Sequence, residues 1–426
     1  MRRWAAMAML VVSVRNAAPQ DRRVITIDEA EALAVHRHPR IAAAGFGAQA
    51  AASAIKQASA AFRPLVSASV TTAGADRDTA IAAGTLQTSG LASRAATGIG
   101  LSQLITDFGR TSNLTDAARR RADAQKSNIA QTRAEVLLQV KLAYYSVLAS
   151  DASLKVARAR VQMQDVTLRQ VRALAESKLK STLDVSFAEV ALSEAQMALY
   201  QAENAATASR AQLASAMGQE DDIDFQVVDM ALPPRPDDGV QVMIAQAIRN
   251  RPDLAAARLG EDAAQRFAAA EKRLRYPAIS AIAVLGAVPV HQNNMSGQYS
   301  SAGLNISIPF LNGGALKARW AEAEFRAQGA GKEAEALRVQ IAASVRLANL
   351  EVDTAWRRLD VTARLVNQTS TALRLASTRY ELGLSGILEL TQAQLAQTSA
   401  QIAAANAKYD YLSRTAGLSY AIGDLR

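Results

Sequence analysis

The sequence predicts a mainly α-helical chain built from two copies of one repeat, each carrying two strands and a very long helical hairpin. Residues 110–217 contain neither proline nor glycine, the two residues that break or weaken helices. Glycines and acids recur in the second half at a constant spacing of 205 residues. Alternating apolar and polar residues occur only ahead of each long helix, so the expected order is helix, strand, loop, strand, long helix, turn, helix.

The N-terminal residues have the pattern of a secretory signal peptide. Arg2 and Arg3 precede an apolar run over residues 4–14 that is too short to span a bilayer as a helix, and small residues follow it. We therefore expect a signal peptide over 1–18, with a frayed cytosolic N-terminus as the alternative. The chain has no cysteine, which excludes disulfides, thiolate metal sites and a cysteine nucleophile.

The first repeat is expected over residues 19–219. Within it we predict strands at about 64–72 and 97–106, a long helix at about 110–177, a tip at 178–182 and a helix at 183–217. Ser181 and Thr182 can cap the second helix, and Asp184 lies in its first turn. At 1.5 Å per residue the long helix measures roughly 100 Å, a length typical of a coiled coil or a helical tube.

The second repeat is expected over residues 239–426, after a linker at 220–238. Its strands are predicted at about 278–286 and 303–310, its long helix at about 314–381, its tip at 382–387 and its last helix at 388–420. The following pairs differ by 205: Gly109 and Gly314, Asp184 and Glu389, Gly218 and Gly423. Pro39 and Pro64 differ from Pro252 and Pro277 by 213, which confines the length difference to the strand regions.

The strand segments alternate between apolar and small or polar residues. In residues 304–310, Leu304, Ile306 and Ile308 share one face while Asn305 and Ser307 share the other. This pattern fits the wall of a transmembrane β-barrel and equally a soluble β-hairpin. Four strands are too few to close a barrel, so a barrel reading requires several chains to share one.

Charge and motifs argue against nucleic-acid binding and catalysis. The formal charge is +9, but basic residues alternate with acids along helical segments and aromatic residues make up only 5% of the chain. The three histidines, His36, His38 and His291, lack metal-ligand spacing, and no phosphate-binding loop precedes a helix. Residues 107–109 read Asp-Phe-Gly, but the other kinase motifs are missing. We expect no enzyme activity, no cofactor and no metal.

Three local patterns resemble the TolC-like outer membrane efflux protein family. The junctions "LSQLITDFGR" (101–110) and "ISIPFLNGGA" (306–315) resemble its strand-to-helix transitions. The segment "TRYELGLSGILELTQAQL" (378–395) resembles its second hairpin tip, and "LASAMG" (213–218) resembles the end of the preceding hairpin. These patterns occur in the family's order across the two repeats, and the resemblance covers nearly the whole mature chain.

The resemblance implies a specific fold and function. Each chain of a homotrimer would lend four strands to one twelve-stranded β-barrel in the outer membrane, continued by a periplasmic α-helical barrel. The protein would be the passive exit duct of a tripartite efflux or type I secretion system. Its partners would be outer membrane lipid, a periplasmic adaptor and an inner-membrane transporter. A periplasmic adaptor, or a coiled-coil scaffold without a membrane barrel, is the alternative.

The resemblance also assigns candidate site residues. A ring of Glu389 side chains would attract cations to a constriction at the periplasmic entrance, although an acid in a first helical turn is also favourable without any channel. Gln392 occupies the position of a second carboxylate ring, and Tyr380 that of a residue tying helices shut. The adaptor-docking tips would comprise Lys178, Leu179, Lys180, Ser181, Thr182, Gly383, Leu384, Ser385 and Gly386.

Two further expectations concern the turns. Lys178 corresponds to Gly383, so we expect the first tip to turn less tightly than the second. At the strand-to-helix junctions, an Asp or Asn that can cap a helix precedes a glycine that relieves the backbone. The junction residues are Asp107, Gly109, Asn312 and Gly314.

Overall fold

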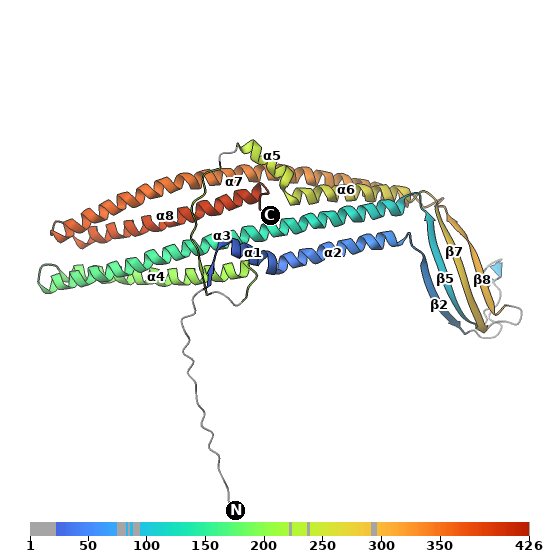
Figure 1. The fold of residues 1–426 in the computed structure, drawn as a ribbon, viewed down its shortest axis with the longest axis horizontal. Helices are drawn as coiled ribbons and strands as arrows, with labels where there is room; N and C mark the ends of the chain where they lie inside the picture. The colour runs from blue at the N-terminus through green and yellow to red at the C-terminus, as the bar shows by residue number, and fades with distance from the viewer. Residues whose placement is uncertain are drawn as a thin grey trace, which may run out of the picture. The chain divides into compact units, whose positions relative to one another are not determined.

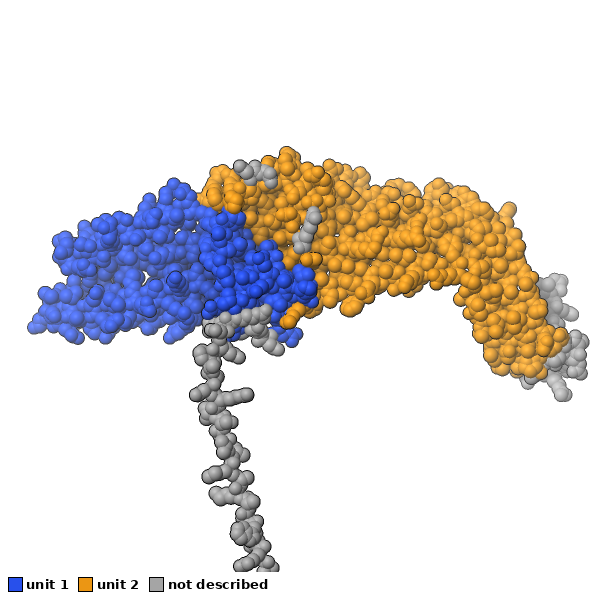
Figure 2. Space-filling model, in the orientation of Figure 1, with its two compact units in different colours: residues 1–36, 140–233, 358–412 blue, residues 37–139, 234–357, 413–426 orange. Residues whose placement is uncertain are grey.

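The computed structural model describes residues 23–74, 82–83, 86–87, 94–220, 224–236, 239–290 and 296–425. The expected signal peptide and His291 lie outside the described residues. The chain divides into two compact units, which Figure 2 colours separately. Unit 1 comprises residues 1–36, 140–233 and 358–412, and unit 2 comprises 37–139, 234–357 and 413–426.

Two helical hairpins account for about half of the chain (Figure 1). The first consists of α3 (Arg110–Glu176) and α4 (Thr182–Ala216), and the second of α7 (Ala315–Glu381) and α8 (Ile387–Ala421). The paired helices have equal lengths, 67 residues for α3 and α7 and 35 for α4 and α8. Each bound in the second hairpin is the corresponding bound in the first plus 205, so the repeat holds in the backbone as well as in the sequence.

Shorter helices precede each pair of strands. They are α1 (Ile27–Arg37) and α2 (Pro39–Ala60) in the first repeat, and α5 (Val240–Asn250) and α6 (Pro252–Arg273) in the second. Pro39 and Pro252 each open a helix because a first-turn proline has no intrahelical hydrogen bond to lose. Among the described helices, none combines the length and the apolar character that a membrane span requires.

The linker expected at 220–238 contains a strand that the sequence analysis missed. Strand β6 (Phe225–Val227) pairs in parallel with β1 (Arg23–Ile25). Both strands have three residues, too few for a periodic pattern to show. The Tyr144 hydroxyl fixes the pair to α3 by accepting the Val228 N–H at 2.9 Å and lying 3.1 Å from the Ile25 carbonyl oxygen.

Unit 2 contains a four-stranded antiparallel sheet in the order β2–β5–β7–β8. Its strands are β2 (Leu65–Ala73), β5 (Arg94–Thr106), β7 (Ala278–Val290) and β8 (Gln298–Ser307). A separate pair is formed by β3 (Ala82–Ala83) and β4 (Leu86–Gln87).

The strand bounds of the second repeat differ from the expected ones. The strand expected at 303–310 spans Gln298–Ser307, and the one expected at 278–286 extends to Val290. The register explains the early end of β8, because Ser307 pairs with Ala278 and the ladder stops where Pro277 precedes its partner strand. Alternation in the sequence continues to Phe310, but β7, the described partner of β8, begins at Ala278 opposite Ser307 and cannot pair with later residues.

Two paired glycines leave room for one aromatic ring on a face of the sheet. Gly98 on β5 pairs with Gly286 on β7, which in turn pairs with Tyr299 on β8. A Cβ atom on either glycine would overlap the Tyr299 phenol, and on Gly286 it would also overlap the Thr97 carbonyl oxygen. The phenol therefore covers the bare backbone of both glycines and helps to fix the strand register.

Large apolar side chains remain exposed on all four strands. They include Val66, Val70, Ile99, Leu101, Ile282, Leu285, Leu304 and Ile306. Strands β2 and β8 form the two edges of the sheet, each with a partner on only one side among the described strands. A sheet with exposed apolar side chains and two long edges presents a surface that another apolar medium and further strands can cover.

Candidate functional site

The two hairpin turns in unit 1 have the same backbone conformation. Lys178 has φ = 60° and Gly383 has φ = 75°, both left-handed. The Leu179 N–H donates to the Leu174 carbonyl at 2.9 Å, and the Leu384 N–H donates to the Arg379 carbonyl at 2.8 Å, as in a Schellman turn. The expectation that the first tip turns less tightly is therefore wrong. Lys178 adopts the same left-handed conformation as Gly383, although only glycine does so without a steric penalty.

The helices that follow the two turns begin differently. Ser181 caps α4: its hydroxyl accepts the Asp184 N–H at 3.2 Å, and the Asp184 carboxylate accepts the Ser181 N–H at 3.1 Å. The corresponding residue before α8 is Gly386, which has no side chain to make such a cap. Asp184 in the first repeat thus takes part in a helix cap, whereas its counterpart Glu389 in the second repeat does not.

Glu389 instead pairs across its own hairpin. Its carboxylate lies 3.1 Å from Nε of Arg379, in the last turn of α7, and both side chains are about half exposed. Gln392 is exposed one helical turn further along α8. The acid proposed for a cation-attracting ring therefore has a basic partner within the same chain.

Tyr380 packs where all four tip helices of unit 1 meet. It is 6% exposed and lies in a cluster with Leu168, Val171, Ala188, Ile387 and Leu390. The Lys180 ammonium lies 4.2 Å from the centre of its ring. Among the described residues its buried hydroxyl has no hydrogen-bond partner, so Tyr380 joins the hairpins through its ring. Burial, together with the charge of Asp184, raises the pKa of Tyr380.

The remaining turn residues form an exposed apolar and basic surface. Leu179, Leu382 and Leu384 are each about two-thirds exposed or more, while Ser385 is half-buried. Along α4, Leu183, Phe187 and Val190 continue this exposed apolar surface at helical spacing. Such an exposed apolar stripe is typical of a surface that packs against another helix.

A buried polar contact above the tip was not foreseen from the sequence. The Gln164 side chain on α3 donates to the Gln394 side-chain carbonyl at 3.2 Å, and Gln394 donates to the Thr167 hydroxyl at 3.2 Å. All three side chains are buried. The contact joins the first hairpin to the second, and glutamine within a helical pattern gave no signal because it is usually exposed.

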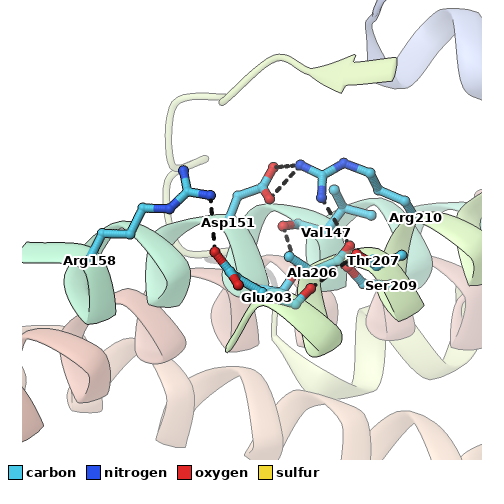
Figure 3. Close-up of polar contacts among 9 residues, drawn as sticks. Val147, Asp151, Arg158, Glu203, Ala206, Thr207, Ser209 and Arg210 are labelled. Carbon is cyan, nitrogen blue, oxygen red and sulfur yellow. Dashed lines mark hydrogen bonds and ion pairs between the residues drawn. The ribbon is translucent and has the colours of Figure 1, made fainter. Parts of the chain in front are cut away.

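Charged side chains also join α3 and α4 within the first hairpin (Figure 3). Arg210 forms a bidentate pair with Asp151 at 2.6 and 2.9 Å, and Arg158 lies 3.6 Å from Glu203. These residues line a hollow of about 830 Å³ that also borders β6. The sequence predicts the turn at 178–182, but a separation of 59 residues does not by itself show that the Asp151 and Arg210 side chains face each other across the hairpin.

The strand-to-helix junction of the first repeat in unit 2 is capped as the sequence predicts. The Asp107 carboxylate is buried and accepts the Thr111 N–H at 2.7 Å, the Thr111 hydroxyl at 2.5 Å and the Gly109 N–H at 3.2 Å. All three donors belong to the start of α3 or the turn before it. The side chain therefore serves the helix cap rather than a metal ion.

The second junction repeats this geometry. The Asn312 side chain accepts the Leu316 N–H at 3.4 Å. Gly109 and Gly314 have φ of 89° and 85°, and the residues before them, Phe108 and Gly313, have φ of 54° and 58°. Phe108 is thus a second non-glycine residue in the left-handed region whose counterpart is glycine.

Comparison with known proteins matches nearly the whole chain. The sequence model described as "Outer membrane efflux protein" matches residues 32–219 and 243–424. Outer membrane protein TolC of Vibrio cholerae is 25% identical over 321 residues, covering 73% of this chain and 72% of that protein.

Solved structures show the same fold. The outer membrane protein VceC from Vibrio cholerae has a TM-score of 0.79 at 20% identity, covering 93% of this chain and 96% of that chain. The open state of the MtrE outer membrane channel from Neisseria gonorrhoeae has a TM-score of 0.76 at 19% identity, covering 94% and 89%. The family match spans both repeats, and the chain therefore belongs to the outer membrane efflux protein family, as a TolC-like protein of the outer membrane that extends into the periplasm.

Proposed function

We propose that the protein is the exit duct of a tripartite efflux or type I secretion system. In this role it passively conducts substrates that an inner-membrane transporter and a periplasmic adaptor deliver. The sheet of unit 2 carries most of this proposal, because its exposed apolar side chains suit lipid and its two open edges suit pairing with further copies. Membership of the outer membrane efflux protein family is the second support.

The same edges support a homotrimer with one shared barrel. Strands β2 and β8 have nine and ten residues, the length of a tilted membrane-spanning strand. Three chains would pair β8 of one copy with β2 of the next and close twelve strands without a free edge. The long hairpins would then form the periplasmic helical tube, and the two tips would face the adaptor.

The tip residues supply the proposed entrance. Three copies of the Glu389–Arg379 pair would surround the pore with charges of both signs, and Gln392 would lie one turn inside. Tyr380 would hold the four tip helices together through its ring and the Lys180 ammonium. Opening would require this cluster to separate.

Membrane fractionation tests the proposal against its alternatives. A duct is expected in the outer membrane fraction, to need detergent for extraction and to conduct in planar bilayers. A periplasmic adaptor has one hairpin flanked by compact β domains, whereas this chain has two hairpins. A protein that remains soluble without detergent would overturn the proposal in favour of a scaffold.

Paired charge variants test the entrance. In planar bilayers Glu389→Ala should lower cation selectivity and raise conductance, whereas Arg379→Ala should raise cation selectivity, because each variant leaves the opposite charge without its partner. Gln392→Ala serves as the neutral control on the same helix. If the two charge variants shift selectivity in the same direction, or not at all, Glu389 acts only as a helix-end acid.

A further inference from the structure

A basic pocket built around Trp320 lies where the sheet of unit 2 joins its helices. The pocket has a volume of about 280 Å³ and is formed by the end of α6, the segment between β8 and α7, and the start of α7. The Lys272 ammonium and the Arg275 guanidinium each lie 5.3 Å from the centre of the Trp320 ring. Lys317 adds a third cation from the first turn of α7. Two cations at the indole and a third that lines the same pocket make a compact positive site with an apolar floor.

No described carboxylate neutralises the three cations of this pocket. Among the described residues, Lys272, Arg275 and Lys317 form no ion pair with a carboxylate. Glu271 is the acid that lines the pocket, but it is 4% exposed and pairs with Arg319 at 3.0 Å. The pocket therefore offers three cations to an external anion.

The fold itself does not require this cluster. At the equivalent positions the first repeat carries Ser59 for Lys272, Phe62 for Arg275, Ser112 for Lys317 and Thr115 for Trp320. The helices at both positions have the same bounds once the repeat offset is applied. Because the first repeat forms the same junction without any of the four residues, their presence in the second indicates a role beyond folding.

The residues beside the pocket identify the kind of anion. Phe310 and Leu311, which lie three and four residues after the end of β8, are 97% and 94% exposed. Two large apolar side chains in water are unfavourable, whereas the same side chains at a membrane interface contact acyl chains. A ligand that fits both the cations and these apolar side chains has an anionic head and an apolar tail.

We propose that this pocket binds the headgroup of an anionic phospholipid in the periplasmic leaflet of the outer membrane. Lys272, Arg275 and Lys317 hold the phosphate, Trp320 lies beneath the headgroup, and Phe310 and Leu311 contact the acyl chains. The inference rests on the proposed function in one respect, namely that the sheet spans the membrane. It adds one lipid-binding site to each chain, where the sheet is followed by α7.

Native mass spectrometry of the detergent-purified protein tests this proposal. Dioleoylphosphatidylglycerol or dioleoylphosphatidylcholine is added, and the number of retained lipids per chain is compared. We expect the wild type to retain the anionic lipid preferentially. The variant Lys272→Ser with Lys317→Ser, which introduces the residues of the first repeat, should weaken that retention by about tenfold or more.

A matched control removes the same charge elsewhere. Arg338→Ser with Arg346→Ser alters two exposed cations on α7, about 30 Å or more beyond Lys317 along the helix, and should leave lipid retention unchanged. Equal retention of both lipids by the wild type, or an equal loss in the control, would overturn the proposal. If Lys272→Ser with Lys317→Ser does not assemble, the anionic preference of the wild type must still fall at high salt.

Two further arms separate the possible explanations. Inorganic phosphate at millimolar concentration should not displace the lipid, and full displacement would identify a free-anion site instead. Conductance in planar bilayers should be unchanged in Lys272→Ser with Lys317→Ser. A wild type that retains the anionic lipid but does not conduct would refute the proposed duct and leave the lipid site standing.

Discussion

At the scale of single residues, the backbone at Lys178 makes a reciprocal test possible. Lys178 and Gly383 occupy the same left-handed position in equivalent turns. A non-glycine residue there costs about 1 kcal/mol. We expect Lys178→Gly to stabilise the first turn and Gly383→Lys to destabilise the second by about that amount. Amide exchange at Leu179 and Leu384, whose N–H groups close the two turns, measures both effects.

The charge of Lys178 needs its own control. Lys178→Ala removes the ammonium but keeps a Cβ in the left-handed region, so it should not slow exchange at Leu179. If the alanine variant protects this amide as well as the glycine variant does, the effect comes from charge and not from the backbone conformation.

These residues also show how far the sequence reaches at this scale. The helix cap by Ser181 and the junction cap by Asp107 could be predicted, because each depends on side chains within four residues of the group they bind. The conformation of Lys178 was missed, because the turn is set by two helices that must run back along each other, and that requirement overrides the preference of one residue. The Tyr380 hydroxyl, which has no hydrogen-bond partner among the described residues, could not be predicted for a related reason: a local pattern does not contain the side chains of other helices.

At the scale of elements, the buried glutamines between α3 and α8 should behave as a coupled pair. Gln394→Leu removes the acceptor of Gln164 and the donor to Thr167, and leaving buried polar groups without partners costs about 1–3 kcal/mol. Adding Gln164→Leu restores an apolar contact, so the double variant should be less destabilised than the sum of the single variants. Unfolding of all four proteins forms a double-mutant cycle, and strict additivity would show that the two side chains do not interact.

The packing of α3 in unit 1 has a pH dependence of its own. Burial, with smaller contributions from Glu31 and Tyr144, raises the pKa of Tyr145 to about 12. The folded protein therefore retains this proton at a pH where the unfolded chain, with a value near 10.0, has lost it. The neutral phenol contributes stability that is fully present below pH 10 and is lost as the pH rises towards 12, by up to about 2 kcal/mol.

Tyr145→Phe should remove this part of the alkaline loss. Tyr409, whose pKa burial also raises to about 12, and the Lys141–Glu31 ion pair remain in the variant, so the difference from the wild type isolates Tyr145. Circular dichroism during unfolding between pH 9 and 12 provides the measurement. Parallel stability curves for the two proteins would show that Tyr145 ionises equally in the folded and unfolded chain.

The limits of the long helices could be predicted from the sequence better than those of the strands. The helices α3 and α7 could be placed because 67 residues without an interior break by proline leave little alternative. The limits of β8 could not, since a strand ends where its neighbour ends, and the neighbour is known only from the register. Strands β1 and β6 pair residues about 200 positions apart over three positions each, a length at which no periodicity exists.

At the scale of the whole molecule, the two faces of β8 should respond differently to the same charge. Ile306 and Asn305 are neighbours on an exposed strand, so their side chains point to opposite faces of the sheet. If three copies close the proposed barrel, Ile306 faces lipid and Asn305 faces the lumen. A lysine facing lipid costs about 2–4 kcal/mol at the bilayer midplane and about 1 kcal/mol or less near its surface, where Ile306 lies because β8 ends at Ser307, whereas a lysine in the lumen remains hydrated.

Ile306→Lys is therefore expected to reduce the yield of assembled protein in the outer membrane fraction, while Asn305→Lys should assemble normally and shift selectivity towards anions. Membrane fractionation measures the first effect and planar-bilayer reversal potentials the second. The reverse result would place the apolar face inward, and equal tolerance of both lysines would mean that neither face meets lipid. A difference between the two variants would indicate a closed barrel, because only a closed wall places lipid on one face of the sheet and water on the other.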